Sequence, residues 1–354
     1  MEIVKLSLKD KNSYPILIGN GLLKDCGKLI SDIVPVSRVF LITDENVAPL
    51  YLERVKESLE NSGFKVFSKV VKAGEQSKSI KVLGEVLEDM AKAHITRADL
   101  AISLGGGVVG DLTGFAAGCY LRGIKFIQIP TTLLAAVDAS VGGKTAVNLE
   151  QGKNLAGLFY QPQAVICDTD TLMTLKNEQI QDGAAEAIKT AILADEKLFE
   201  IYEKKDAKEY YEEIIIRCVK YKAKIVSEDP TEKGVRKLLN LGHTAAHSIE
   251  LLSDFKISHG HAVAIGTAII TTAAYKRGLV TEDVLNRIIY TLKRNDLPVS
   301  TSFTAKQLAK IAENDKKAAA EFITVIMPRK IGKCSMDKIL LSELEALLSD
   351  GMES

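Results

Sequence analysis

Short runs of β-branched and other apolar residues alternate with amphipathic stretches through the first half of the chain. The apolar runs predict strands at residues 38–43, 64–71, 100–107, 125–132 and 164–168. Between them, helical spacing of apolar side chains predicts helices at residues 46–63, 79–94 and 110–118. Strands that take turns with helices of about 10–15 residues indicate a mostly parallel sheet with helices on its faces. Two further runs, 2–10 and 14–19, predict a strand pair added at one edge.

The pattern changes near residue 178, beyond which most segments have helical periodicity. These segments are residues 182–205, 209–229, 242–253 and 261–278, and one late strand is predicted at 321–328. The sequence therefore predicts an α/β domain over residues 1–177 and a mainly α-helical domain over residues 178–354. Because no linker rich in Pro, Gly or Ser separates them, we expect the two domains to pack together around a ligand-binding cleft.

The composition excludes several classes of partner. Lysine plus arginine equals aspartate plus glutamate at 46 each, so no overall field recruits nucleic acid or an anionic membrane. The five cysteines are widely spaced without a C-x-x-C motif, which is typical of a reducing cytoplasm. The most apolar run, residues 262–275, is shorter than the ~20 residues of a membrane span and predicts a buried helix. We therefore expect a soluble cytoplasmic protein.

A glycine-rich turn lies between a predicted strand and a predicted helix. Gly105, Gly107 and Gly110 fit G-x-G-x-x-G, in which backbone amides at a helix N-terminus approach a pyrophosphate. This is not the first strand-helix turn of the chain, so a variant of the Rossmann fold is predicted rather than the ordinary one. Asp44, at the end of an earlier strand, is placed to bond a ribose hydroxyl. The alternative is a tight turn without a ligand.

Four of the five histidines, His243, His247, His259 and His261, fall between residues 239 and 261. His243 and His247 are four apart and share a helical face, as zinc-binding imidazoles do, but the glutamate of H-E-x-x-H is missing. A catalytic zinc has three protein ligands and one open position. Spacing does not identify which histidines bind. An acidic ligand is also needed, and Glu186, with Lys189 three residues on, is a candidate; an exposed ion pair is the alternative.

Several basic residues lie in segments that are unusual for surface charge. Lys144, Lys153 and Asn154 lie in a glycine-rich segment, and Arg236 and Asn240 come just before His243. Cations near a metal and a dinucleotide indicate a small substrate with more than one anionic group, such as a phosphate and a carboxylate. Three further lysines lie close together in the sequence, at Lys220, Lys222 and Lys224. For these three, the alternative to substrate binding is plain surface charge.

Taken together, these segments resemble the 3-dehydroquinate synthase family of sugar phosphate cyclases along nearly the full length. The matching segments are TDEN, AGEQSKS, SLGGGVVGDLTGFAA, YLRGI, QIPTTLLAAVDASVGGKTAVNLEQGKNLAG, AAEAIK, GVRKLLNLGHTAAHSIE, HGHAVAIG and NDKK. The resemblance implies NAD⁺ as a recycled cofactor, one Zn²⁺ or Co²⁺ per chain, a homodimer, and a step of the shikimate pathway.

The resemblance also implies roles for individual residues. The implied metal ligands are Glu186, His243 and His259. The implied cofactor contacts are Asp44, Ala73, Gly74, Glu75, Gln76, Ser77, Lys78, Gly106, Gly107, Val108, Val109, Gly110, Asp111, Thr131, Thr132, Lys144, Lys153, Thr171, Leu172, Met173 and Thr174. The implied substrate contacts are Lys144, Lys153, Asn154, Lys222, Arg236, Asn240, one of Lys316 and Lys317, and Arg122 reaching a neighbouring subunit's phosphate site. The implied catalytic residues are Asp138, Lys144, Lys189, Asn240 and His247, the last for proton handling, with the substrate's own phosphate as the alternative base.

The implied reaction converts 3-deoxy-D-arabino-heptulosonate 7-phosphate to 3-dehydroquinate and phosphate. Oxidising the alcohol to a ketone acidifies the neighbouring C–H, so phosphate can leave by β-elimination before the hydride returns; ring opening and an aldol closure follow. A metal supplies a Lewis acid. His261 stands where the family usually has glutamate, beside an implied metal ligand, so it is expected either to change the support of that ligand or to bind the metal itself.

Three other functions fit part of the pattern. A metal-dependent polyol dehydrogenase of the glycerol dehydrogenase type would release NADH and would not need the basic residues. A sibling cyclase would act on another sugar phosphate. A non-catalytic zinc-stabilised protein would give no reason for the glycine turn and the basic residues to accompany the histidines.

Overall fold

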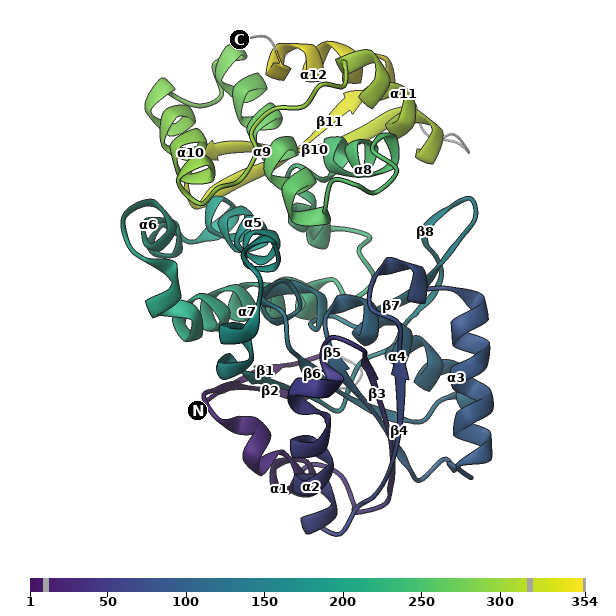
Figure 1. Cartoon of the computed structure of the whole chain (residues 1–354). Coiled ribbons are helices and arrows are strands. Elements are labelled where there is room, and N and C mark those ends of the chain that lie inside the picture. The colour runs from purple at the N-terminus through teal and green to yellow at the C-terminus, as the bar shows by residue number, and fades with distance from the viewer. Residues whose placement is uncertain (9–12, 317–320, 353–354) are drawn as a thin grey trace. The chain divides into compact units, whose positions relative to one another are not determined.

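The computed structural model describes residues 1–8, 13–316 and 321–352, without the side chains of residues 313–316. The chain forms two compact units (Figure 1). The first contains Met1–Leu175 and Lys222–Thr231, and the second contains Lys176–Tyr221 and Glu232–Ser354. Among the described residues, no helix is both long enough and apolar enough to cross a membrane.

The first unit alternates strands and helices as predicted. Its strands are β1 (Glu2–Leu6), β2 (Tyr14–Gly19), β3 (Arg38–Asp44), β4 (Lys65–Val71), β5 (Leu100–Gly105), β6 (Lys125–Pro130), β7 (Lys144–Leu149), β8 (Gly152–Phe159) and β9 (Ala164–Asp168). Its α-helices are α1 (Cys26–Ser31), α2 (Glu53–Asn61), α3 (Ile80–Lys92) and α4 (Gly107–Cys119). Short 3-10 or π turns are η1 (Leu22–Asp25), η2 (Ala48–Leu52), η3 (Glu75–Ser77), η4 (Tyr120–Arg122), η5 (Ala135–Ala139) and η6 (Thr169–Thr174).

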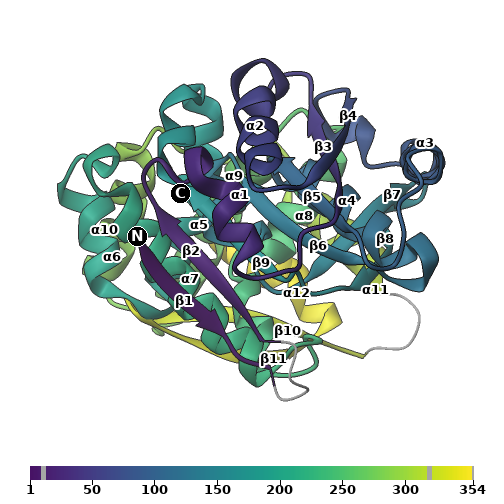
Figure 2. The ribbon, with the colours of Figure 1, turned by 90° about the horizontal axis from the view of Figure 1, so that it is seen from below.

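Seven strands of this described part form one sheet in the order β1-β2-β9-β6-β5-β3-β4. All neighbours are parallel except β1 and β2, so the predicted strand pair at one edge is confirmed. Successive side chains of a strand point to opposite faces. Leu41 packs with residues of α1 and α2, whereas Ile42 packs with residues of α3 and α4. Figure 2 shows the strands β3 and β4 between α2 and α3. The inner strands of the sheet are therefore buried on both faces, which explains their nearly continuous apolar runs, whereas the edge strand β4 is mostly exposed or half-buried.

The glycine-rich segment after the sheet strand β6 folds as a hairpin. No strand was predicted here, but β7 and β8 pair in an antiparallel ladder whose register shifts between Val147 and Leu149. Most of β8 is exposed, so the hydrophobic alternation of a half-buried strand is weak in the sequence. This hairpin includes Lys144, Lys153 and Asn154.

The second unit is mainly helical. Its helices are α5 (Asn177–Ala194), α6 (Glu196–Lys204), α7 (Tyr211–Glu228), α8 (His243–Leu252), α9 (His259–Lys276), α10 (Glu282–Arg294), α11 (Ala305–Lys316) and α12 (Leu344–Met352). The last residues of α7, from Lys222 on, belong to the first unit. Short turns are η7 (Ala207–Tyr210), η8 (Val235–Asn240) and η9 (Leu341–Glu343). The predicted late strand is β10 (Phe322–Lys330). Its antiparallel partner β11 (Lys333–Leu340) was not predicted, because its charged, partly exposed residues hide its strand character.

Helix α9 forms the centre of the second unit and contacts α5, α8, α10, α12 and β10. Its residues are buried on nearly every side, so the prediction of a buried helix at 262–275 is confirmed. A helix that is apolar all round needs such surroundings. Gly266 lets α8 approach closely, because a Cβ there would lie 2.1 Å from the carbonyl oxygen of Gly242.

Replacing Gly266 by alanine is expected to lower the free energy of unfolding by about 2–3 kcal/mol, because backbone atoms of α8 must move to admit the methyl group. Urea unfolding measures this change. Gly84 of α3 is the matched control, since a Cβ there meets no atom within 4 Å. Gly84→Ala is expected to raise stability by about 0.5–1 kcal/mol. Equal stability of the two variants would contradict the close approach of α8 and α9.

Candidate active site

Three residues of the second unit form a cluster suited to a metal ion. Glu186 lies on α5, His243 begins α8, and His259 begins α9. Their ligand atoms all lie within 4.8 Å of one another. Oε1 of Glu186 is 3.5 Å from Nε2 of His243 and 3.3 Å from Nε2 of His259. The structure therefore brings together the three residues that the resemblance implies as ligands.

The spacing of these atoms fits a tetrahedral divalent ion. Zinc bonds of about 2.0–2.1 Å at a tetrahedral angle place two ligand atoms about 3.3 Å apart. The two distances from Glu186 Oε1, 3.3 and 3.5 Å, agree with that geometry. Two imidazoles and one carboxylate leave a fourth position open, as in catalytic rather than structural zinc sites.

Hydrogen bonds at the other ring nitrogen orient both histidines. Nδ1 of His243 lies 3.1 Å from the carbonyl oxygen of Leu241, and Nδ1 of His259 lies 3.2 Å from Oε2 of Glu250. When Nδ1 donates to these acceptors, Nε2 is left as the ligand atom on each ring. Glu250 is buried, and the sequence analysis did not identify it.

The cluster carries a buried charge pair. Glu186 and Lys189 are 1% and 2% exposed and form an ion pair one helical turn apart, so the alternative of an exposed pair is excluded. Burial opposes ionisation of Glu186, but the ammonium of Lys189 and the two imidazoles outweigh it and hold the pKa of this carboxyl well below its usual value. Burial, with the positive charge of Lys189, lowers the pKa of His243 to about 3. Burial also disfavours the charged form of His259, yet hydrogen bonds to Glu186 and Glu250 raise its pKa to about 10.

Asp182 ties together the two helices that carry Glu186 and His259. Its Oδ1 accepts hydrogen bonds from Ser258 Oγ at 2.5 Å and from the backbone amide of Gly260 at 3.0 Å. A Cβ at Gly260 would lie 2.3 Å from Cα of Asp182, so only glycine fits between the helices. Asp182 precedes Glu186 by one turn of α5, so this contact fixes the start of α9 beside the carboxylate ligand.

Replacing Glu250 by glutamine is expected to weaken metal binding about 10–100-fold, because the carboxylate no longer holds His259 and raises its basicity. Competition with a chromophoric chelator measures the affinity. His261 provides a matched control: its Nε2 faces Gln181 Oε1 at 3.1 Å, and it lies outside the three-residue cluster of the described chain. His261→Ala is expected to bind metal as tightly as the unaltered chain. The reverse ranking of the two variants would make His261 the supporting or binding group.

The other predicted residues of the second unit whose side chains the structure describes lie on η8 and α8. Arg236 is fully buried, which excludes plain surface charge. Asn240 donates a hydrogen bond to Glu232 Oε1 at 2.7 Å, and Glu232 is a residue that the sequence analysis missed. The His247 ring lies 5.4 Å from that of His243 and 6.5 Å from that of His259, between centroids, so it borders the cluster. Lys316 and Lys317 lie outside the residues whose side chains the structure describes.

One of the three lysines of α7 differs from the others. Lys222 is buried, and its ammonium contacts the backbone oxygen of Asp138 at 2.7 Å and Oδ1 of the same residue at 2.8 Å. Lys220 and Lys224 are exposed, so surface charge describes them and not Lys222.

Arg122 of η4 is exposed, with a left-handed backbone at φ 66°.

The predicted cofactor residues follow the carboxyl ends of the parallel strands. Asp44 ends β3, the segment 73–78 follows β4, Gly106–Asp111 follow β5, Thr131 and Thr132 follow β6, and the segment 171–174 follows β9. This edge is where open α/β sheets bind ligands. A Cβ at Gly110, in the first turn of α4, would lie 2.7 Å from Oε1 of Gln128, so a larger residue there would require the Gln128 side chain to shift. The structure thus brings these scattered segments to one edge.

Lys78 connects the cofactor segments with the β7–β8 hairpin. It is 6% exposed, and its ammonium donates to Oδ2 of Asp111 at 2.6 Å and to Oδ1 of Asn154 at 2.5 Å. One side chain therefore contacts a residue of the glycine-rich turn and a residue of the predicted substrate set.

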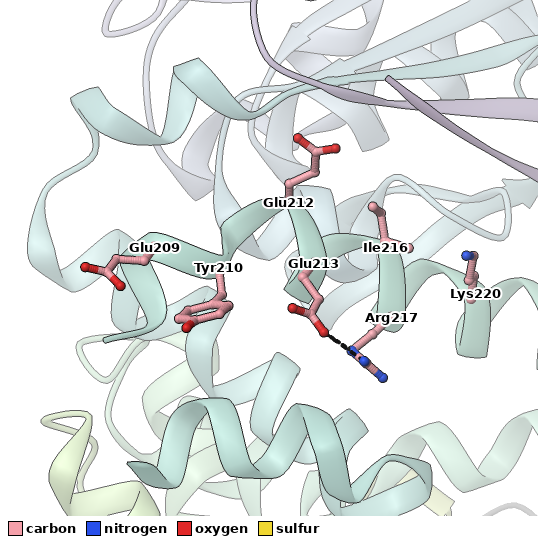
Figure 3. A pocket seen from close by; sticks show the side chains of 7 residues that line it. All are labelled: Glu209, Tyr210, Glu212, Glu213, Ile216, Arg217 and Lys220. Atoms are coloured by element: carbon pink, nitrogen blue, oxygen red, sulfur yellow. Dashed lines mark hydrogen bonds and ion pairs between the residues drawn. The ribbon is translucent and has the colours of Figure 1, made fainter. Parts of the chain in front are cut away.

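A separate pocket lies on η7 and α7 (Figure 3). Its lining residues are Glu209, Tyr210, Glu212, Glu213, Ile216, Arg217 and Lys220. Arg217 and Glu213, one turn apart on α7, form an ion pair at 2.7 Å in its lining. None of its lining residues belongs to the predicted metal, cofactor or catalytic sets, so we do not assign the site to it.

Comparison with known proteins identifies the family. Two family models, 3-dehydroquinate synthase N-terminal and 3-dehydroquinate synthase C-terminal, match residues 68–182 and 183–318. The 3-dehydroquinate synthase of Clostridium acetobutylicum is 42% identical over 93% of this chain and 94% of its own, and that of Caldanaerobacter subterraneus subsp. tengcongensis is 42% identical over 98% and 99%. The structure of 2-epi-5-epi-valiolone synthase from Streptomyces hygroscopicus subsp. jinggangensis with NAD⁺ and Zn²⁺ bound is 27% identical, covers 95% of each chain and superposes with a TM-score of 0.86. The chain belongs to the 3-dehydroquinate synthase family.

Proposed function

We propose that this protein is a carbon-oxygen lyase that converts 3-deoxy-D-arabino-heptulosonate 7-phosphate to 3-dehydroquinate and phosphate. The proposed route is transient oxidation, β-elimination of phosphate, re-reduction, ring opening and intramolecular aldol closure, as a step of the shikimate pathway to aromatic amino acids. The observation that carries the proposal is the cluster of Glu186, His243 and His259 with an open fourth position, in a chain 42% identical to a 3-dehydroquinate synthase.

Glu186, His243 and His259 would hold Zn²⁺ or Co²⁺, and the edge formed by Asp44 and Gly106–Asp111 would hold NAD⁺. When bound, NAD⁺ accepts and returns a hydride, while the divalent ion acts as a Lewis acid. The protein's own groups bind and orient. Buried Arg236 and Lys222, with Lys144, Lys153 and Asn154, suit a substrate with phosphate and carboxylate groups. Their binding energy fixes the reacting carbons, as remote contacts do in enzymes.

Protons are handled by residues around the metal ligands. His247, beside the rings of His243 and His259, is proposed to exchange a proton with the substrate near its phosphate. Lys189 and Asp138 complete the proposed catalytic set with Lys144 and Asn240. Buried Lys222 and Arg236 also argue against a polyol dehydrogenase, since a neutral alcohol substrate gives no reason to bury these charges.

The proposed organisation is a cofactor domain over residues 1–177 and a metal and substrate domain over residues 178–354. We further propose a homodimer in which Arg122 reaches the neighbouring subunit's phosphate site; its exposure and left-handed backbone support this role. A cytoplasmic location is supported by the cysteines, all five of which are described and are free thiols.

Purified protein with NAD⁺ and Zn²⁺ or Co²⁺ is expected to release phosphate from 3-deoxy-D-arabino-heptulosonate 7-phosphate without net NADH, because the hydride returns to the product. Phosphate is measured colorimetrically and NADH by its absorbance. Other six- and seven-carbon sugar phosphates serve as alternative substrates, and glycerol tests the dehydrogenase. Faster phosphate release from another sugar phosphate would identify a sibling cyclase, and sustained NADH formation from glycerol would refute the proposal.

A further inference from the structure

We propose that Asn148 is a positioning residue that joins the cofactor segment 75–78 to the substrate residue Asn154. It belongs to neither predicted set. The proposal rests on the proposed function for the roles of Glu75, Lys78 and Asn154, whereas the contacts themselves come from the first unit alone.

Asn148 lies where the β7–β8 ladder is irregular. Val147 pairs with Ala156 and Leu149 pairs with Gly152, so the register shifts across Asn148. Between these two pairs, β8 contains residues 153–155 whereas β7 contains Asn148 alone, so β8 is bulged. Bulges of this kind change the direction of side chains next to active sites. Asn148 forms its own parallel bridge, with Ser79. Asn148 therefore lies between the bulged residues of β8, which include Asn154, and the segment before α3.

Three polar groups of Asn148 bond to two different segments. Its backbone amide donates to the carbonyl oxygen of Lys78 at 2.8 Å, and its side-chain Nδ2 donates to Oε1 of Glu75 at 2.7 Å. Its side-chain Oδ1 accepts from the backbone amide of Asn154 at 2.9 Å. The side-chain amide thus bridges a cofactor residue and a substrate residue with its donor on one side and its acceptor on the other.

Asn154 needs this support because its backbone is left-handed, at φ 57°, and its side chain is exposed at the end of the hairpin. Asparagine tolerates that conformation better than most residues, but the conformation is still less stable than the right-handed one. Two contacts hold it: Asn148 at the backbone amide and Lys78 at Oδ1, the latter 2.5 Å long. Because the backbone oxygen of Lys78 also accepts from Asn148, the contacts close a ring through residues 78, 148 and 154.

The consequence is that cofactor and substrate residues are placed together. Asn148 holds Asn154 at the orientation in which it meets the substrate, relative to a segment that meets the dinucleotide. Loss of such orientation raises KM and lowers kcat/KM without removing any group that touches the substrate.

The first test measures the contacts directly by hydrogen-deuterium exchange. In Asn148→Ala, the Asn154 amide is expected to exchange about tenfold faster, because its acceptor is gone. Asn148→Asp keeps that acceptor but sets a carboxylate against Glu75, so only the segment 73–79 is expected to exchange faster. Combining Asn148→Asp with Glu75→Gln reverses donor and acceptor and is expected to restore the slow exchange. Glu150→Ala, an exposed residue of the same turn, is the matched control and is expected to change neither segment.

The second test separates positioning from general stability. Asn148→Ala is expected to raise KM for the heptulosonate phosphate about tenfold, the effect of one lost hydrogen bond, but by less than about twofold when Asn154 is already alanine. An equal rise in both backgrounds, or unchanged exchange at Asn154 in Asn148→Ala, would overturn the proposal. If the unaltered protein released no phosphate from this substrate, the proposed function would fail, and the exchange measurements alone would decide whether Asn148 holds Asn154.

Discussion

Glu186→Gln is expected to abolish tight metal binding and to reduce phosphate release by at least about a thousandfold, the scale of losing a key electrostatic group. The amide is a poorer ligand than a carboxylate, and it removes the negative charge that faces His243 and His259 at 3.5 and 3.3 Å. The substitution also removes the carboxylate that pairs with the ammonium of Lys189, a side chain that is 2% exposed. Breaking a buried ion pair costs about 3–5 kcal/mol, so stability is expected to fall as well. Metal content after dialysis and urea unfolding measure the two effects.

A double variant separates these effects. Glu186→Gln combined with Lys189→Met removes both charges, and stability is expected to recover because replacing a buried ion pair by apolar groups is often neutral. Metal binding is not expected to recover, since the carboxylate ligand is still missing. Full metal content in Glu186→Gln would refute the ligand assignment, whereas recovery of metal binding in the double variant would mean that folding, and not ligation, caused the loss.

The fold was predictable where burial leaves a strong pattern. The parallel strands other than the edge strand β4 are buried on both faces, so their apolar runs stand out, and the edge pair β1–β2 was recognised from the same signal. The strand β11 and the hairpin β7–β8 were not recognised. Both consist of partly exposed strands whose alternation is interrupted by polar residues, and their stability depends on pairing with a neighbour rather than on a local pattern.

The metal ligands could not be predicted from the spacing of the histidines alone. Histidine spacing grouped His243 with His247, because residues four apart share a helical face. In the structure the cluster instead contains His243 and His259, which begin two different helices, with Glu186 from a third. The resemblance implied this set, but spacing alone could not. Glu250 and Asp182 were missed because their importance depends on which helix ends pack beside α5 and α9.

Which lysine of α7 is buried could likewise not be predicted from spacing alone. Lys220, Lys222 and Lys224 are spaced two apart, so they cannot share one helical face. Lys220 and Lys224 are four apart and do share a face, with Lys222 on the opposite side, so spacing separates Lys222 from the other two but does not show which side faces inward. Only the packing of α7 in the first unit buries Lys222 against Asp138.

Lys78→Met is expected to weaken NAD⁺ binding at least about tenfold and to lower the free energy of unfolding by about 2 kcal/mol, the typical value of charged hydrogen bonds. The ammonium of Lys78 bonds to Asp111 at 2.6 Å and to Asn154 at 2.5 Å, so its removal affects both the glycine-rich turn and the hairpin. Calorimetric titration with NAD⁺ and urea unfolding measure the two effects.

The pH dependence of this variant has a definite sign. Burial raises the pKa of Asp111 despite the opposing charges of Lys78 and, more weakly, Lys222, and Glu75 adds to the rise. A carboxyl whose pKa is raised in the folded state stabilises the fold most when it is protonated. Its contribution to the free energy of unfolding therefore falls as the pH rises from the usual pKa of the carboxyl towards the raised pKa. Removing Lys78 raises that pKa further. The loss of stability in Lys78→Met is therefore expected to be larger at about pH 7.5 than at about pH 5, and Asp111→Asn in the same chain is expected to remove the difference. A loss that does not vary with pH would mean that Lys78 acts through its packing, because a pairing role requires an ionised Asp111.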